Sequence, residues 1–322
     1  MSVLEILIGL LGLMAVIIGA EFTVKGGKGL AKGLGVPPFF IGLTMLSIGT
    51  SLPEIFTHLV SSYSIVTGAG DVKALSGVAV GTNIGSNLCA ATLVTGVAGL
   101  FGIIKTSEKF LRRDFLMLII AIAIVQIFAL SHVIDRFEGF VLMMIYAGYM
   151  FHLIKTENIV SKVSGKKHEK LGKSILFLFI GLVFLTGGAN FVIDMAMQAV
   201  DTFGISGSLI GALVIGLITS MPELITALTG VLKGSTAMSF GTLVGSNITT
   251  LLFALGLGSV ISKYEVSNKI LWVDLPIFFI GSVLILFLFW NKFQLKRYKA
   301  LILVLFYASY VGIRIYVDIN FP

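Results

Sequence analysis

The stretch Ile48-Gly49-Thr50-Ser51-Leu52-Pro53-Glu54-Ile55 puts a carboxylate in the middle of an apolar run, and similar words return 169 positions later as Leu217-Ile218-Thr219-Ser220-Met221-Pro222-Glu223-Leu224. Of the 16 acidic residues, only Glu54 and Glu223 fall well inside a hydrophobic span. A carboxylate at membrane depth costs at least about 2.5–3.5 kcal/mol, so two of them indicate a function. The proline before each Glu suits the first turn of a helix and frees backbone carbonyls behind it. Since broken helices occur at membrane depth only where they line a cavity, the two breaks imply a cation site.

The composition excludes a soluble globular protein. The 322 residues are 57% hydrophobic and only 12% charged, with a mean hydropathy of +1.03, whereas a globular domain carries about 25% charged residues. The net charge of +7 does not indicate nucleic-acid binding, because the basic residues stand in short clusters between apolar runs. Cys89 is the single cysteine, which excludes an internal disulfide framework or a cysteine metal cluster. The N-terminus has no basic region, so we expect the first apolar run to be a retained helix.

The apolar runs predict ten transmembrane helices in two groups of five. They cover residues 3–24, 37–63, 76–104, 115–131 and 137–154, then 174–197, 206–231, 237–262, 270–290 and 300–317. We expect a first five-helix repeat over 1–154, a Lys-rich cytoplasmic linker over 155–173 and a second repeat over 174–322. With both termini outside, the cytoplasmic connections hold 18 of the 23 basic residues, as the positive-inside rule requires. The sequence therefore predicts an integral membrane protein, in the cell membrane, with both termini outside.

The repeat extends beyond the two acidic stretches. A second block, Gly81-Thr82-Asn83-Ile84-Gly85-Ser86-Asn87, matches Gly241-Thr242-Leu243-Val244-Gly245-Ser246-Asn247 at an offset of 160. Its paired glycines predict close helix packing. Five helices per repeat is an odd number, so the two repeats lie in opposite orientations. The fold predicted is an all-α membrane protein of two inverted five-helix repeats, with discontinuous helices at the midplane, which is typical of secondary transporters.

Glu54 and Glu223 are expected to meet on the axis that relates the repeats. Two unit charges 4 Å apart repel by about 4 kcal/mol at an effective dielectric of 20. Both stay ionised only with a cation between them; otherwise one takes up a proton. A divalent cation, or monovalent cations in alternation, would neutralise the pair, and calcium takes about six to eight oxygen ligands. Hydroxyls and freed carbonyls can supply these oxygens at Ser47, Thr50, Ser51, Gly216, Thr219 and Ser220, and at Ser86 and Ser246 from neighbouring helices.

Other polar residues near the motifs allow two interpretations each. Asn87 and Asn247 are either ligands or interhelical hydrogen-bond partners. His58, one helical turn after Glu54, has a packing or hydrogen-bonding role, or else it tunes Glu54 or carries a proton. Asp274, at a helix entrance, is expected to anchor that helix at the membrane interface.

The two blocks closely resemble the alpha repeats of the cation/calcium exchanger superfamily, which typically read G-T-S-x-P-E and G-S-N-x-x-[ND]. The resemblance covers residues 37–104 and 206–262 and looks most like the sodium/calcium branch, because the acid follows Thr-Ser-x-Pro. It implies a secondary antiporter that exchanges calcium for sodium by alternating access, not an enzyme, with no cofactor. It also implies that Glu54 and Glu223 bind calcium with backbone oxygens around Thr50 and Thr219. Sodium sites would use Ser51, Ser86, Ser220 and Ser246.

One departure from the family pattern bears on the coupling ion. Four residues after each Gly-Ser serine the family commonly has Asn or Asp, whereas this chain has Ala90 and Thr250, so the middle of the site has fewer oxygens. The closest alternative is a proton/calcium antiporter of the same fold, with Glu54, Glu223 and His58 titrating, and a cation channel is a remote one. The expected partners are calcium and sodium ions and the lipid bilayer, with no nucleic acid and no obligate protein partner.

Overall fold

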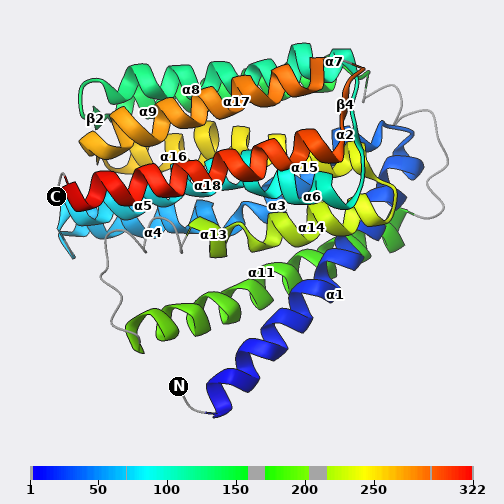
Figure 1. Ribbon diagram of the computed structural model, residues 1–322, viewed down its shortest axis with the longest axis horizontal. Helices are drawn as coiled ribbons and strands as arrows, with labels where there is room; N and C mark the ends of the chain where they lie inside the picture. The colour runs from blue at the N-terminus through cyan, green and yellow to red at the C-terminus, as the bar shows by residue number, and fades with distance from the viewer. Residues whose placement is uncertain (1–2, 70, 159–170, 203–215, 291, 321–322) are drawn as a thin grey trace.

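The computed structural model describes residues 3–69, 71–158, 171–202, 216–290 and 292–320, and it is mostly helical (Figure 1). The helical elements of the first half, in which η marks a π-helical segment, are α1 (Val3–Leu34), α2 (Pro38–Ile41), η1 (Gly42–Leu46), α3 (Ser47–Thr50), α4 (Leu52–Thr67), α5 (Val72–Cys89), η2 (Ala90–Val94), α6 (Thr95–Phe101), α7 (Glu108–Phe110), η3 (Leu111–Phe115), α8 (Leu116–Ala129) and α9 (Arg136–Thr156). Those of the second half are α11 (Leu171–Thr202), α13 (Gly216–Thr219), α14 (Met221–Leu232), α15 (Thr236–Ile248), η5 (Thr249–Ala254), α16 (Leu255–Ile261), η6 (Ile270–Asp274), α17 (Leu275–Trp290) and α18 (Arg297–Asn320). The strands are β1 (Ile104–Lys105), β2 (Val133–Ile134), β3 (Tyr264–Glu265) and β4 (Gln294–Leu295).

The described helices include six that are long and apolar enough to cross a membrane. They become seven if the pair Pro38–Thr50 and Leu52–Thr67, bent by 45°, counts as one span. The other predicted spans coincide with α1, with α8 and with the segment that ends in α14, of which residues 206–215 lie outside the described residues. This pattern is that of a helical membrane protein.

Both Thr-Ser-x-Pro-Glu stretches break a helix, as the sequence predicts. The chain passes from α3 to α4 at Ser51, with φ −85° and ψ 4°, and from α13 to α14 at Ser220, with φ −81° and ψ 2°. In each case the proline stands in the first turn of the new helix, where its missing N–H leaves a preceding carbonyl without its helical partner. The same local geometry is therefore made twice from the same residue types.

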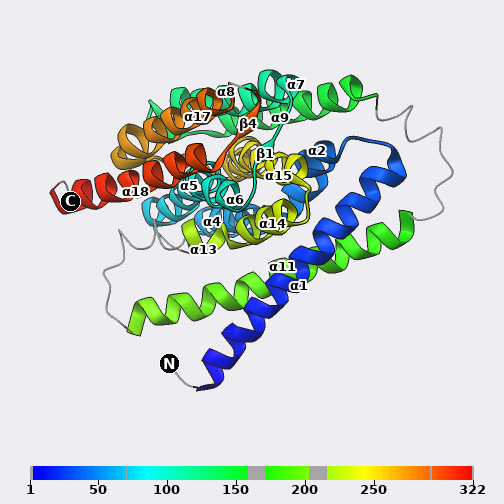
Figure 2. The same ribbon diagram turned by 45° about the vertical axis from the view of Figure 1, so that its right-hand side comes forward.

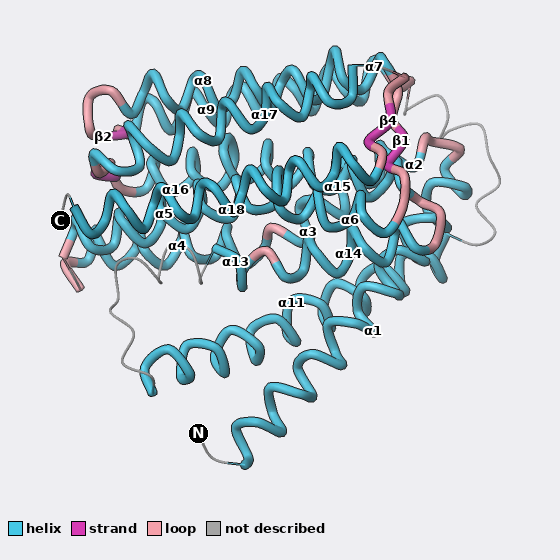
Figure 3. Tube along the Cα trace, in the orientation of Figure 1, coloured by secondary structure: helices cyan, strands magenta, loops and turns pink. Residues whose placement is uncertain are grey.

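Two antiparallel strand pairs join the halves of the chain at opposite ends of the bundle (Figure 3). Strand β1 pairs with β4, with Ile104 opposite Leu295, and β2 pairs with β3, with Ile134 opposite Tyr264. Two-residue strands in short loops carry no periodic signal, and the sequence does not predict them. Each pair joins one segment from each half, so neither half closes on itself.

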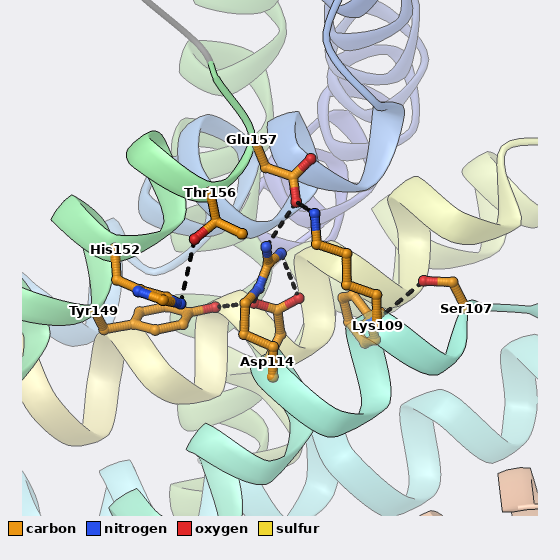
Figure 4. Close-up of polar contacts among 9 residues, drawn as sticks. Ser107, Lys109, Asp114, Tyr149, His152, Thr156 and Glu157 are labelled. Atoms are coloured by element: carbon orange, nitrogen blue, oxygen red, sulfur yellow. Dashed lines mark hydrogen bonds and ion pairs between the residues drawn. The ribbon is translucent and has the colours of Figure 1, made fainter.

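A buried ionic cluster ties α7 and η3 to the end of α9 (Figure 4). Asp114, with no exposed surface, accepts two hydrogen bonds from Arg113 and one from the Tyr149 hydroxyl at 2.8 Å. Arg113 also bonds Glu157 at 2.6 Å, and Lys109 lies 2.7 Å from the same carboxylate. Burial raises the pKa of Glu157, but the hydrogen bonds from Lys109 and Arg113 outweigh it and hold the pKa below its usual value.

A second cluster of the same kind ties η6 to the end of α18. Asp274 is bonded by Tyr310 and by Arg314, each at 3.1 Å, and Arg314 and Lys269 both contact Asp318. Only 4% of Asp274 is exposed. Its partner arginine lies 40 positions along the chain, beyond any local pattern, so the sequence does not indicate this pairing.

The centre of the bundle is formed by the continuous helices Val72–Phe101 and Thr236–Ile261. In each of them 78% of the residues of the most apolar 18-residue stretch are buried, against 28% in α9 and in α18. The long helices α1 and α11 lie side by side on one face of this bundle (Figures 1 and 2). They approach so closely that a methyl group on Gly26 would lie 2.5 Å from the backbone nitrogen of Leu178. Val16, Ala20 and Leu185 form a hydrophobic cluster of their own between them. The pair is thus packed as a unit against the bundle.

Candidate cation site

Glu54 and Glu223 lie in the first turns of α4 and α14 and are almost fully buried, with 4% and 2% of their surface exposed. The two side chains are near enough for their charges to interact. In each, Oε2 has no hydrogen-bond partner among the described residues. The start of a helix favours negative charge, but a buried carboxylate oxygen without a donor is costly. A cation between the acids would satisfy both oxygens.

Hydroxyl groups from both halves surround these acids. Ser246 Oγ donates to Glu223 Oε1 at 3.0 Å and lies 2.8 Å from Ser51 Oγ. The Thr50 hydroxyl, which donates to the backbone oxygen of Ser47 at 3.3 Å, lies beside Glu223. The acid of one half is therefore held by residues of both, and these oxygens are the hard ligands that calcium and sodium prefer.

The remaining predicted oxygens lie on or beside the same two breaks. Ser220 Oγ donates to the backbone carbonyl of Ser86 at 3.2 Å, which joins α14 to α5. Ser47 Oγ is already engaged, since it donates to carbonyls one turn earlier at 2.7 and 2.9 Å. Gly216 begins α13, and Thr219, which is buried, ends it.

The two repeat-related asparagines differ in their surroundings. Asn87 Oδ1 accepts from the Thr250 hydroxyl at 2.7 Å, and Asn87 Nδ2 donates to Asn83 Oδ1 at 2.8 Å. Asn247 Oδ1 is buried and has no partner among the described residues. The cause is visible in the sequence, because Ala90 stands in the first half where Thr250 stands in the second.

A buried polar chain continues from Asn83 to His58. Asn83 Nδ2 lies 2.9 Å from the backbone oxygen of Thr250 and 2.8 Å from His58 Nε2. His58 Nδ1 lies 3.2 Å from the Tyr264 hydroxyl, which also contacts Ser62 at 2.5 Å. Sequence reasoning assigned no role to Asn83 or Tyr264. The spacing of four between Asn83 and Asn87 places both on one helix face and could have indicated the first, but nothing in the sequence indicates Tyr264.

A cavity of about 580 Å³ lies beside the break at Ser51. Its lining includes Pro53, which precedes Glu54, and Thr219, which lies four residues before Glu223. Hydroxyls line part of its wall, and hydroxyls suit the passage of a partly hydrated ion. The lining residues are Leu52, Pro53, Phe56, Thr57, Val60, Ser61, Val78, Thr82, Thr186 and Thr219.

Solved structures of similar fold are known. The chain matches the sodium-calcium exchanger NCX_Mj, in a structure soaked with sodium and calcium, with a TM-score of 0.82 and 27% identity over 97% of this chain and 99% of that one. A structure of the same exchanger soaked without either ion matches with a TM-score of 0.79. The likeness spans nearly the whole of both chains, so it includes both broken segments.

Sequence comparisons agree with the structural ones. The chain is 25% identical to the sodium/calcium exchanger MaX1 of Methanosarcina acetivorans, over 98% of this chain and all of that protein. It is 30% identical to the membrane protein MJ0091 of Methanocaldococcus jannaschii, over 94% of each, and 30% identical to the putative antiporter CaxA of Alkalimonas amylolytica, over 79% of each. Two of these relatives are named as an exchanger and a putative antiporter, and the chain is a transporter and not an enzyme. The family model described as sodium/calcium exchanger protein matches residues 4–155 and 173–316, and the chain therefore belongs to that family.

Proposed function

We propose that this protein is a secondary active antiporter that moves calcium out in exchange for sodium, by alternating access at one site between Glu54 and Glu223. The observation that carries the proposal is the pair of buried acids, each with a carboxylate oxygen that lacks a partner among the described residues. The ion pairs among the described residues do not include Glu54 or Glu223, so no Lys or Arg of the described residues neutralises these two acids. Cations then remain as their partners.

We assign the ligands from the oxygens that surround the acids. Glu54 and Glu223 would hold calcium, together with backbone oxygens of the two breaks. Sodium ions would use the hydroxyls and carbonyls when calcium has left. The full set proposed is Glu54, Glu223, Ser47, Thr50, Ser51, Ser86, Asn87, Gly216, Thr219, Ser220, Ser246 and Asn247.

Electrostatics explains why such a site exchanges ions and does not leak. Two charges 4 Å apart repel by about 4 kcal/mol at an effective dielectric of 20, and burial adds the cost of desolvating each carboxylate. The empty, doubly charged site is therefore too costly to pass between its outward-open and inward-open forms. One calcium ion, or two sodium ions in its place, removes the charge and permits that step. A channel has no such requirement, which makes it the less suitable reading of paired acids.

We further propose ten spans in two inverted repeats, residues 1–154 and 174–322, joined by the linker 155–173, in the cell membrane with both termini outside. The two strand pairs at opposite ends of the bundle support this arrangement. So do the ionic clusters, in which Asp114 and Tyr149 correspond to Asp274 and Tyr310 at offsets of 160 and 161. The π-helical segments also recur, η2 with η5 and η3 with η6, at offsets of 159 or 160. With this topology the cavity lies on the outer half of α4 and α5, and we assign it as the approach of an ion toward Glu54, which follows the lining residue Pro53.

A flux assay in proteoliposomes tests the proposal. An outward sodium gradient, or an inward one as its control, is imposed with a protonophore present, and uptake of radioactive calcium into the vesicles is measured. Sodium/calcium exchange predicts uptake driven by the sodium gradient and unaffected by the protonophore, whereas loss of uptake with the protonophore would identify the proton/calcium antiporter. Glu54→Gln keeps the shape of the side chain and removes its charge, so exchange should be lost. Glu265→Gln, at an exposed position on β3, is the matched control.

A further inference from the structure

The orientation of each amide in the polar chain between Thr250 and His58 follows from one backbone carbonyl. The oxygen of Thr250 can only accept, so the Asn83 atom at 2.9 Å from it must be Nδ2. The other end of that amide is then Oδ1, and the Asn87 atom at 2.8 Å from it must be Nδ2. Asn87 therefore turns its Oδ1 to the Thr250 hydroxyl, which donates to it at 2.7 Å.

The same reasoning fixes the tautomer of His58. Asn83 Nδ2 is a donor and lies 2.8 Å from His58 Nε2, so Nε2 must accept and can carry no proton. The ring proton then lies on Nδ1, 3.2 Å from the Tyr264 hydroxyl, and that hydroxyl donates to the backbone oxygen of His58 at 3.0 Å. Protonating Nε2 would set two donors against each other. It would require Asn83 to turn over, at the cost of its bonds to Thr250 and Asn87.

The fold itself does not need this polar chain. At the repeat-related positions in the other half, His58 is replaced by Ala227, Asn83 by Leu243, Thr250 by Ala90 and Tyr264 by Ile104. All four replacements are apolar and fully or almost fully buried. Since the equivalent helices of the other half pack at these positions without polar groups, stability alone does not explain why the polar hydrogen-bonded chain is present.

The polar chain of hydrogen-bonded residues ends beside the proposed cation site. The Thr250 hydroxyl lies 2.9 Å from the backbone oxygen of Ser246, whose own hydroxyl donates to Glu223 at 3.0 Å. Thr250 also belongs to η5, a π-helical segment, and such segments free carbonyls for side-chain donors and are frequent at functional sites. Asn87 Oδ1 keeps one lone pair after accepting from Thr250, in an orientation that the chain determines.

We propose that His58 is a positioning residue: as a neutral imidazole it accepts from Asn83, orients Asn87 and Thr250 for cation binding beside Glu223, and does not carry a coupling proton. The inference rests on the proposed cation site and deepens it, since it names the group that orders one side of that site. Among the side chains of the described residues that hydrogen-bond the His58 ring, Tyr264 is the titratable one, and it faces the protonated Nδ1. Glu54 lies one turn earlier on the same helix. The excess proton would therefore have to enter where Asn83 already donates.

Nuclear magnetic resonance of the full-length protein, with 15N-labelled histidine, tests the tautomer directly. The chain has 4 histidines, and the signal missing from His58→Gln identifies His58. We expect this signal to remain that of a neutral ring with its proton on Nδ1 from pH 5 to pH 8. A ring that gains a proton in this range, or one with its proton on Nε2, would overturn the inference.

Transport by two variants tests the positioning role. His58→Leu removes the acceptor and should raise the KM for calcium by about 3- to 10-fold, the equivalent of one buried hydrogen bond. His58→Gln offers an acceptor without a titrating ring, so it should recover most of this loss and keep the pH profile of wild type. A profile that changes in His58→Gln, or an equal loss in both variants, would contradict the role. His152→Gln, at an exposed position on α9, is the control. Should wild type show no sodium-driven flux, the proposed function would fail while the resonance result still decides the tautomer.

Discussion

Gly245→Ala tests whether the site depends on the close approach of two helices. Gly245 precedes Ser246 on α15, and a methyl group there would lie 2.7 Å from both Cα and the backbone oxygen of Leu43 and 2.8 Å from Ser47 Cβ. Ordinary contact begins at 3.4 Å, so a separation of the helices by about 0.7 Å is needed to restore it. Backbone atoms cannot rotate aside, which leaves displacement of η1 and α3 as the response.

The displacement acts on both the stability and the site. Overpacking costs about 1–3 kcal/mol, and alanine returns about 0.5–1 kcal/mol because it suits a helix better than glycine, so the protein should still fold. Metal sites tolerate errors in ligand distance of only about 0.2 Å, well below the displacement. We therefore expect calcium affinity to fall by about 10-fold or more, or about 1.4 kcal/mol.

Calorimetric titration of purified protein with calcium, together with its thermal unfolding, separates these effects. The control is Gly148→Ala, because a methyl group at that position of α9 meets nothing within 4 Å. Calcium affinity should be unchanged in the control. Wild-type affinity in a folded Gly245→Ala protein would refute the claim that this contact sets the geometry around Ser246.

Three further predictions address the hydroxyls, the ionic cluster and the cavity. Ser246→Ala removes the donor to Glu223, and since hydrogen bonds to charged groups contribute about 1.5–3 kcal/mol, the KM for calcium in flux assays should rise by at least about 10-fold; an unchanged KM would exclude Ser246 from the site. Glu157→Gln should lower the melting temperature in detergent at pH 7, because the Glu157 pKa is held below its usual value. A pKa that is lower in the folded than in the unfolded state gives stability that is present above the unfolded-state pKa and is lost as the pH falls through the folded-state pKa. The difference in melting temperature from wild type should therefore shrink below about pH 4.5, and a difference that grew there would contradict the assignment. Thr57→Cys should react with a membrane-impermeant thiol reagent added from outside, whereas native Cys89, which is fully buried, should not; reaction only from the inside would reverse the proposed topology.

Features set by local chemistry could be predicted from the sequence. The breaks at Ser51 and Ser220 follow from proline in the first turn of a helix, and this effect needs no tertiary contact. The approach of Glu54 to Glu223 follows from the repetition of the Thr-Ser-x-Pro-Glu sequence in the two halves of a membrane protein. The family resemblance follows from the same two blocks.

Features set by tertiary contacts could not. The pairing of Asp274 with Arg314 could not be predicted, because the two residues lie on different helices. The polar chain through Asn83 cannot be predicted from the internal repeat, since the equivalent residue in the other half is Leu243. Symmetry of sequence predicts where two halves agree, and this chain departs from symmetry where the surroundings of Asn87 and Asn247 differ.

The central claim is that a cation neutralises two buried acids, and anomalous diffraction from crystals soaked in calcium or strontium tests it most directly. Calcium ligands lie at about 2.3–2.6 Å. The account predicts an anomalous peak within that distance of carboxylate oxygens of both Glu54 and Glu223, which disappears when sodium replaces the divalent ion. A protein that binds calcium in solution yet shows the peak elsewhere, or no peak between these acids, would contradict the account.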